Sequence, residues 1–134
     1  MKIVLVGDSI MFGSPGCLGY GAFVKEYFED KRGGSVYFPY ENCQDSGFTA
    51  SAFDALYDLD EIADADVVHW NNGLWDTLHL FGNPRPRSPL NLYLERLDRA
   101  LAKIKLFCPN AKVIFATTTP VIEEKYGKTY RKNE

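Results

Sequence analysis

Short apolar runs rich in Val and Ile alternate with segments of helical character along this chain, and this alternation limits the fold more than any other feature. The runs lie at residues 2–6, 35–38, 66–70 and 112–116. Continuous runs of this length are typical of strands that are buried on both faces of a parallel sheet. Because helical segments separate them, the sequence predicts a β-α-β-α-β-α-β order and therefore an α/β fold.

Three helices are expected between these strands, at residues 22–30, 50–59 and 89–107. The first carries Phe23, Tyr27 and Phe28 at helical spacing and stops at the glycine pair 33–34. The third has Ser88 as the expected N-cap and Pro89 at its first position. Its apolar stripe consists of Leu90, Leu94, Leu97, Leu101 and Ile104. The expected helices are long enough to cover both faces of a small sheet.

Composition excludes several classes of protein. The 134 residues are 46% apolar, so we expect a single domain over residues 1–134. A formal net charge of −3 with scattered Lys and Arg offers no basic surface for nucleic acid. No run is long enough for a signal peptide or a membrane span, so we expect a cytoplasmic protein without a membrane partner. The 3 cysteines include no C-x-x-C pair, which favours free thiols.

Polar residues follow three of the expected strands where each strand ends. These clusters are Gly7-Asp8-Ser9, residues 45–49 and residues 71–76. In open parallel sheets, ligands bind outside the carboxyl ends of the strands, where the winding direction reverses. If the first strand lies between the second and the third, as in the flavodoxin-like order, all three clusters converge on one crevice. The sequence therefore predicts a functional site there.

The clusters resemble the conserved blocks of the SGNH (GDSL-type) serine esterases and lipases, and the resemblance covers most of the chain. Gly7-Asp8-Ser9-Ile10 resembles the first block, whose serine is the nucleophile. Ser46-Gly47-Phe48-Thr49 resembles the second block, whose glycine amide belongs to the oxyanion hole. Gly73-Leu74-Trp75-Asp76 stands in the place of the third block, usually G-x-N-D. The resemblance implies a three-layer sandwich around a flavodoxin-like parallel sheet, and hydrolysis of carboxylic esters.

Ser9 would be the nucleophile, and Gly47 would supply one oxyanion donor; Asp8 is expected to support the site. A serine attacks an ester only when a base takes its proton and preorganised donors hold the oxyanion. Two simpler interpretations remain open, because Ser9 could cap a helix and Gly47 could be a turn glycine.

The third block departs from the family pattern. Trp75 stands where the family has asparagine, so we expect Asn72 to be the second oxyanion donor. The indole N–H of Trp75 is a longer and differently aimed donor, and the amide of Asn72 could instead satisfy loop backbone. Asp76 is expected to fix the loop through hydrogen bonds.

The family's last block, D-x-x-H, is not found in this chain. His69 lies inside the expected third strand, where a packed, hydrogen-bonded role is favoured, and His79 is expected on an exposed loop. The family's last strand and covering helix are also missing, so we expect a truncated chain with impaired catalysis. The run at 112–116 would then be an exposed sheet edge, which a homodimer could cover.

The predicted function is serine-dependent hydrolysis of short acyl esters of small molecules or carbohydrates. No cofactor and no metal site is predicted, since no histidine-rich or C-x-x-C spacing occurs. The alternative is a non-catalytic ligand-binding or interaction module on a flavodoxin-like fold.

Overall fold

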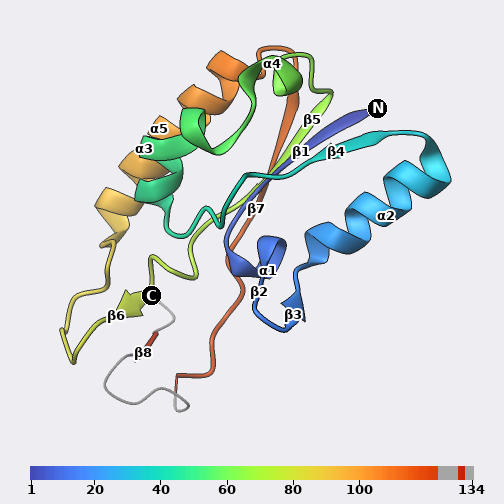
Figure 1. The fold of residues 1–134 in the computed structure, drawn as a ribbon. Coiled ribbons are helices and arrows are strands. Elements are labelled where there is room, and N and C mark those ends of the chain that lie inside the picture. The colour runs from blue at the N-terminus through green and yellow to red at the C-terminus, as the bar shows by residue number, and fades with distance from the viewer. Residues whose placement is uncertain (124–129, 132–134) are drawn as a thin grey trace.

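The centre of the computed structural model, which describes residues 1–123 and 130–131, is a parallel sheet of four strands in the order β4-β1-β5-β7 (Figure 1). The strands are β1 (Lys2–Val6), β4 (Ser35–Tyr37), β5 (Val67–Asn71) and β7 (Lys112–Ala116). Each lies within one residue of its expected position at either end. The first strand pairs with both β4 and β5, so the predicted flavodoxin-like order is confirmed.

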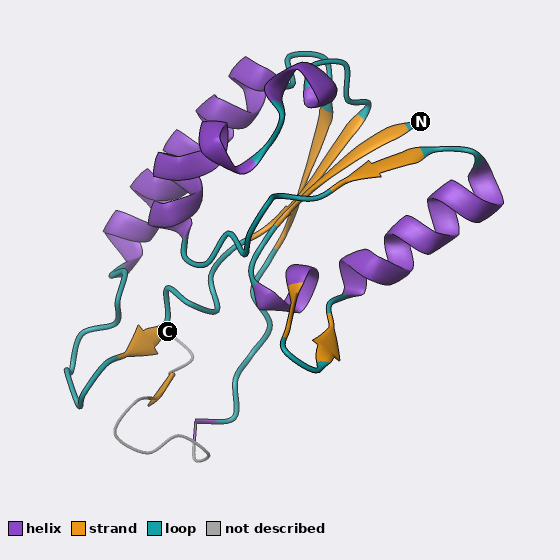
Figure 2. Cartoon of the chain, in the orientation of Figure 1, coloured by secondary structure: helices purple, strands orange, loops and turns teal. Residues whose placement is uncertain are grey.

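Helices cover both faces of this sheet and give three layers (Figure 2). On one face lie α2 (Tyr20–Arg32) and the short α1 (Ser9–Phe12). The other face carries α3 (Ser46–Leu56), α4 (Leu59–Ile62) and α5 (Leu90–Phe107). The predicted α/β sandwich is therefore the observed architecture.

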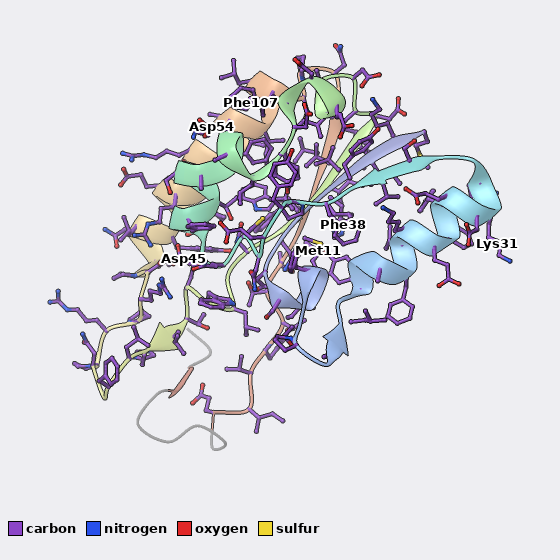
Figure 3. The ribbon with its side chains drawn as sticks, viewed as in Figure 1. Met11, Lys31, Phe38, Asp45, Asp54 and Phe107 are labelled. Atoms are coloured by element: carbon purple, nitrogen blue, oxygen red, sulfur yellow. The ribbon has the colours of Figure 1, made fainter. Side chains whose placement is uncertain are left out.

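Two apolar cores hold the layers together, because successive side chains of a strand point to opposite faces. Val4 and Val6 of β1 belong to the larger core, beneath α3 and α5. Ile3 and Leu5 belong to the smaller core beneath α2. Figure 3 shows Met11 and Phe38 on this α2 side of the sheet.

The first long helix differs from the prediction in extent and in orientation. It begins at Tyr20 and ends at Gly33, which adopts a left-handed φ of 62° as the C-cap. Phe23 and Tyr27, which the helical spacing grouped with Phe28, are 60% and 47% exposed. The core contacts come from Tyr20, Val24 and Phe28. Before this helix, β2 (Gly13–Ser14) and β3 (Cys17–Leu18) form a small hairpin inside the expected glycine loop.

The other helices also start at unexpected positions. Helix α3, which corresponds to the helix expected at residues 50–59, begins at Ser46, four residues before its expected start. It ends at Leu56, and the separate helix α4 follows. The last helix begins at Leu90 with Pro89 at its N-cap, so the prediction of Ser88 as N-cap is wrong. Ser88 instead accepts a hydrogen bond from Arg96.

Only the second half of the apolar stripe on the last helix packs against the core. Ala100 and Ile104 are buried, whereas Leu90 and Leu94 are 70% and 52% exposed. Within the described residues the sheet ends at β7. A separate pair joins β6 (Leu78–His79) to β8 (Tyr130–Arg131) in antiparallel fashion. Among the helices of this part of the chain, none has the length and apolar content needed to cross a membrane. Cys17, Cys43 and Cys108 are free thiols, as expected.

Candidate active site

Ser9 lies on the tight turn between β1 and α1, at the carboxyl end of the central strand. The turn is capped by Asp8, whose buried Oδ1 accepts the backbone N–H of Ile10 at 3.0 Å. Ser9 itself is the first residue of the helix and is half-buried. The interpretation of Ser9 as a helix cap is therefore wrong, because the neighbouring aspartate has that role.

A chain of hydrogen bonds leads away from Asp8 across the α2 side of the sheet. The amide nitrogen of Asn71 donates to Asp8 Oδ1 at 3.3 Å, and the hydroxyl of Tyr20 donates to Asn71 Oδ1 at 3.0 Å. The same hydroxyl lies 3.1 Å from Nδ1 of His69. The aspartate thus connects the Ser9 turn to a polar cluster inside the sheet face.

The directions of these bonds follow from the carboxylate. The NH₂ of Asn71 donates to Asp8, and the side-chain oxygen of Asn71 accepts from Tyr20. The single hydroxyl proton of Tyr20 is then used on Asn71, so the bond to His69 must come from an N–H at Nδ1. In neutral imidazole this leaves Nε2 as an acceptor.

Burial fixes the protonation states along this chain. It raises the pKa of Tyr20 to about 12, with the nearby charge of Asp8 as the second cause. Burial also lowers the pKa of His69 from its ordinary value of 6.5. Tyr20 therefore remains a hydroxyl donor at neutral pH, and His69 remains uncharged.

These side chains line a hollow of about 150 Å³ at the carboxyl end of β5. Its lining consists of Asp8, Ile10, Tyr20, His69, Asn71, Leu74, Ala116, Thr117, Thr118 and Thr119. Asp8 and Ile10 are the two neighbours of Ser9, so the hollow begins beside the predicted nucleophile.

The second predicted cluster forms the first turn of α3 rather than a loop. Asp45 caps this helix by accepting the N–H of Phe48 at 2.9 Å, and it forms an ion pair with Arg87 at 2.7 Å. Figure 3 shows Asp45 at the start of the helix. Gly47 follows in the first turn, where an α-helix provides no internal acceptor for the backbone N–H.

Gly47 is not a turn glycine, because it lies inside the helix and is not among the glycines with positive φ. A Cβ at this position would lie 2.8 Å from Cζ of Arg96 and 3.0 Å from Oδ1 of Asp45. The close approach of the Arg96 guanidinium explains why a residue without a side chain fits here.

Asp76 connects the third cluster to the second. Its Oδ2 accepts the backbone N–H of Ser46 at 3.0 Å, and its Oδ1 accepts the Ser46 hydroxyl at 2.6 Å. Both residues are almost completely buried. The expectation that Asp76 fixes its loop through hydrogen bonds fits this geometry, and the carboxylate also holds the α3 turn that contains Gly47.

Asn72 is buried, and its side chain connects the third cluster to Gln44, the residue just before the second cluster. Its Nδ2 donates to the carbonyl of Gln44 at 3.0 Å, while its Oδ1 accepts the indole N–H of Trp70 at 2.6 Å. The backbone supports the same junction, since the N–H of Cys43 donates to the carbonyl of Gly7 at 3.1 Å. The three predicted clusters therefore meet at one end of the sheet.

The structure does not bring every predicted residue into one hollow. Gly47 lines a second hollow on the α3 side, and Asn72 lines neither of the two. Asn71, a member of the third predicted cluster, and Tyr20 also border the first hollow, although the sequence assigned neither of them a catalytic role. Residues two apart on a strand share a face, so the strand position of His69 already placed Asn71 beside it. Tyr20 was expected near the crevice as part of an apolar wall, and its hydrogen bond to Asn71 was not predicted.

The two histidines differ from each other in surroundings. The predicted strand position and hydrogen bonding of His69 are confirmed. The prediction of an exposed loop for His79 is wrong, because it lies in β6 and is completely buried. Its Nδ1 lies 2.9 Å from the carbonyl of Asn83. Among the described residues, no hydrogen bond joins either histidine to Ser9.

The described residues contain no group of three or more His, Cys, Asp or Glu side chains suited to hold a metal ion. Asp8 and Asp76 are used as hydrogen-bond acceptors in separate places.

Fold and site together define a flavodoxin-like α/β protein whose polar clusters gather at the carboxyl ends of parallel strands. No protein-family model matches the chain, and no curated protein matches it. Among solved structures, it is similar to a psychrotrophic esterase, EstA, from Pseudoalteromonas sp., in a structure inhibited by monoethylphosphonate. The identity is 17% and the TM-score 0.58, over 85% of this chain and 57% of the esterase chain. At this identity the likeness shows a shared fold, and this chain spans little more than half of that esterase.

Proposed function

We propose that the site hydrolyses carboxylic esters with Ser9 as the nucleophile. The observation that carries the proposal is the position of Ser9 at the turn after the central strand, where Asp8 supplies the cap. There the third polar cluster is hydrogen-bonded to the first through Asn71 and to the second through Asp76. Capping does not explain this serine, and the fold is shared with an esterase. The SGNH family remains a prediction from the sequence motifs.

In this proposal Ser9 Oγ attacks the carbonyl carbon of the ester while its proton passes to water as the base. The bond from the carbonyl carbon to the alcohol oxygen then breaks, the alcohol leaves with a proton, and a water molecule hydrolyses the acyl-serine to the acid and free Ser9. Gly47 N–H and Asn72 Nδ2–H would donate to the oxyanion. Nδ2 carries two protons and uses one on Gln44, so a second remains for this role. A donor of this kind contributes about 3 to 4 kcal/mol to the transition state. Asp8 and Asp76 would hold the turns that carry Ser9 and Gly47.

The described residues include no histidine that is hydrogen-bonded to Ser9 and could take its proton. The histidine nitrogens that the structure places in hydrogen bonds are directed to Tyr20 and Asn83 rather than to Ser9. Loss of the base lowers turnover by orders of magnitude, whereas binding and oxyanion donors still contribute. We therefore expect slow turnover by this chain, and covalent modification of Ser9 is a more sensitive measurement than hydrolysis.

Fluorophosphonate labelling followed by intact-mass measurement tests the proposal. We expect one adduct on the wild-type chain and none on Ser9→Ala, because the phosphonate mimics the tetrahedral intermediate. Ser14→Ala is the matched control, since Ser14 is exposed on the β2–β3 hairpin, and its labelling should equal that of the wild type. Adduct formation that persists in Ser9→Ala would exclude Ser9 as the nucleophile. A wild-type chain that never reacts would favour the ligand-binding alternative.

A further inference from the structure

The second hollow, about 470 Å³ in volume, opens beside the first turn of α3 and is lined by three arginines. Arg96 and Arg99 come from α5, and Arg87 comes from the segment before it. Asp45 is the acidic side chain in the lining. The chain as a whole carries a net charge of −3. The lining of this hollow has the opposite sign, because it contains more guanidinium groups than carboxylates.

Two of these arginines are neutralised and the third is not. Arg87 pairs with Asp45 at 2.7 Å, and Arg99 pairs with Glu95 at 2.6 Å. Arg96 donates instead to the hydroxyl of Ser88 at 2.5 Å. A hydroxyl carries no charge, so among the described residues Arg96 has no acidic partner. Its guanidinium has five N–H donors, and this bond uses one of them.

Arg96 is held in a defined place. The hydroxyl that it contacts belongs to the buried Ser88, and the guanidinium lies against Gly47, where a Cβ would come within 2.8 Å of its Cζ and Nε. Arg87 is also fixed, because its Asp45 partner is buried and the Trp75 ring centroid lies 5.6 Å from its Cζ. A positive charge that is already ordered loses little conformational entropy when a ligand binds.

We propose that this hollow is a recognition site for an anionic group, a carboxylate or a phosphate, with Arg96 as its main contact. The planar guanidinium suits both groups because each offers two oxygens to parallel N–H donors. Gly47 allows the close approach of Arg96, and the backbone N–H of Gly47 is the predicted oxyanion donor. The guanidinium therefore lies next to this donor. If the proposed esterase function holds, the anion is a part of the ester substrate.

Anion binding can be measured without turnover, by NMR of the ¹⁵N-labelled chain. The probes are inorganic phosphate and malonate, with sodium chloride at matched ionic strength as the blank. We expect saturable shifts of the Gly47 amide signal and of the Arg96 Nε–H signal with one or both probes. The preferred probe distinguishes a phosphate site from a carboxylate site. Shifts that equal those in sodium chloride for both probes would exclude the site.

Arg96→Gln should weaken probe binding at least about tenfold, because charge-assisted bonds to the anion are lost. The matched control is Arg85→Gln, which removes the same charge from an exposed arginine outside the hollow. This control should bind within about twofold of the wild type, since screening limits its effect. Equal losses in both variants would show a nonspecific charge effect and overturn the proposal.

Gly47→Ala separates the two roles of this glycine. The substitution keeps the backbone N–H but displaces the Arg96 guanidinium, so we expect weaker probe binding while the fold, followed by circular dichroism, is kept. Binding at wild-type strength in Gly47→Ala would contradict the contact geometry on which the site rests.

The link to the ester reaction rests on the proposed function and needs a separate comparison. A neutral ester and an ester of the same length with a terminal carboxylate or phosphate are assayed with wild type and Arg96→Gln. We expect KM for the anionic ester to rise about tenfold in the variant, with KM for the neutral ester unchanged. Phosphate binding without hydrolysis of either ester would keep the anion site and overturn the proposed function. Hydrolysis of the neutral ester without anion binding would keep the proposed function and overturn the anion site.

Discussion

Asp8 organises the carboxyl end of β1 because one buried carboxylate accepts bonds from two directions. Its Oδ1 caps the Ser9 helix through Ile10 and also receives the amide of Asn71. The second bond orients Asn71, which in turn orients the hydroxyl of Tyr20. A single acidic residue therefore determines the proton positions of side chains as far away as His69.

This order of donors predicts the tautomer of His69. We expect neutral His69 to carry its proton on Nδ1, because Tyr20 accepts there, whereas free histidine favours the proton on Nε2. Burial lowers the pKa of His69, so the ring should reach half protonation only below pH 6.5. Long-range ¹H–¹⁵N NMR of the imidazole reports both properties. An Nε2–H tautomer in the wild-type chain would contradict the proposed bond directions.

Tyr20→Phe is the matching variant for this measurement. It removes the acceptor of the Nδ1 proton and keeps the ring, so the population of the Nε2–H tautomer should increase. Tyr27→Phe is the control, because Tyr27 lies on the exposed side of the same helix and bonds to Arg32. The tautomer of His69 should be the same in this control and in the wild type.

At the scale of elements, the first turn of α3 depends on a residue from the β5–β6 connection. Asp76 satisfies both the N–H and the hydroxyl of Ser46 at the helix start. Asp76→Ala would leave these buried donors without their acceptor, at a cost of about 2 to 4 kcal/mol. Urea unfolding should show this loss, and hydrogen exchange should quicken at the start of α3.

The control for this prediction is Ser51→Ala, which removes an exposed hydroxyl from the same helix. A surface change of this kind should alter the free energy of unfolding by no more than about 0.5 kcal/mol. If Asp76→Ala unfolded at the same urea concentration as Ser51→Ala, the carboxylate would not hold the turn.

The strands could be predicted from the sequence because continuous β-branched runs such as Lys2–Val6 suit a parallel sheet that is covered on both faces. Lys112–Ala116 has the same pattern and forms a strand, although its side chains stay partly exposed. Helix starts could not be predicted equally well. The polar residues 45–49 resemble a loop, but Asp45 and Asp76 satisfy the donors of a helical turn there. The helical turn at Ser46 therefore depends on Asp76, about thirty positions further along the chain. A pattern of neighbouring residues cannot reveal a contact of this range.

The candidate site shows the same limit. Ser9 and the meeting of the three clusters followed from strand ends, which are a local signal. His79 lies in β6, which pairs with the distant segment β8, and the hydrogen bond from Tyr20 to Asn71 joins residues 51 positions apart. Contacts of this range are decided by packing, so the sequence motif located the site but not its hydrogen-bond chain.

At the scale of the whole molecule, the covering of the sheet is uneven. The helix α2 packs beside β4 and β1, while β7 forms the outer strand of the described sheet. Ile114 and Phe115 on this strand are 42% and 37% exposed, on opposite faces. An outer strand with apolar side chains and unpaired backbone groups is a surface on which another strand can pair.

We therefore expect this chain to self-associate through β7 as its concentration rises. Ile114→Lys places a charge on the edge strand and should reduce the association constant at least about tenfold, because burying an unpaired charge is costly. Leu106→Lys is the control, since Leu106 is 70% exposed on α5 and its loss leaves the strand intact. Size-exclusion chromatography with light scattering measures the mass across a dilution series. Monomer mass at every concentration would exclude the homodimer, and equal dimer fractions in both variants would exclude β7 as its contact.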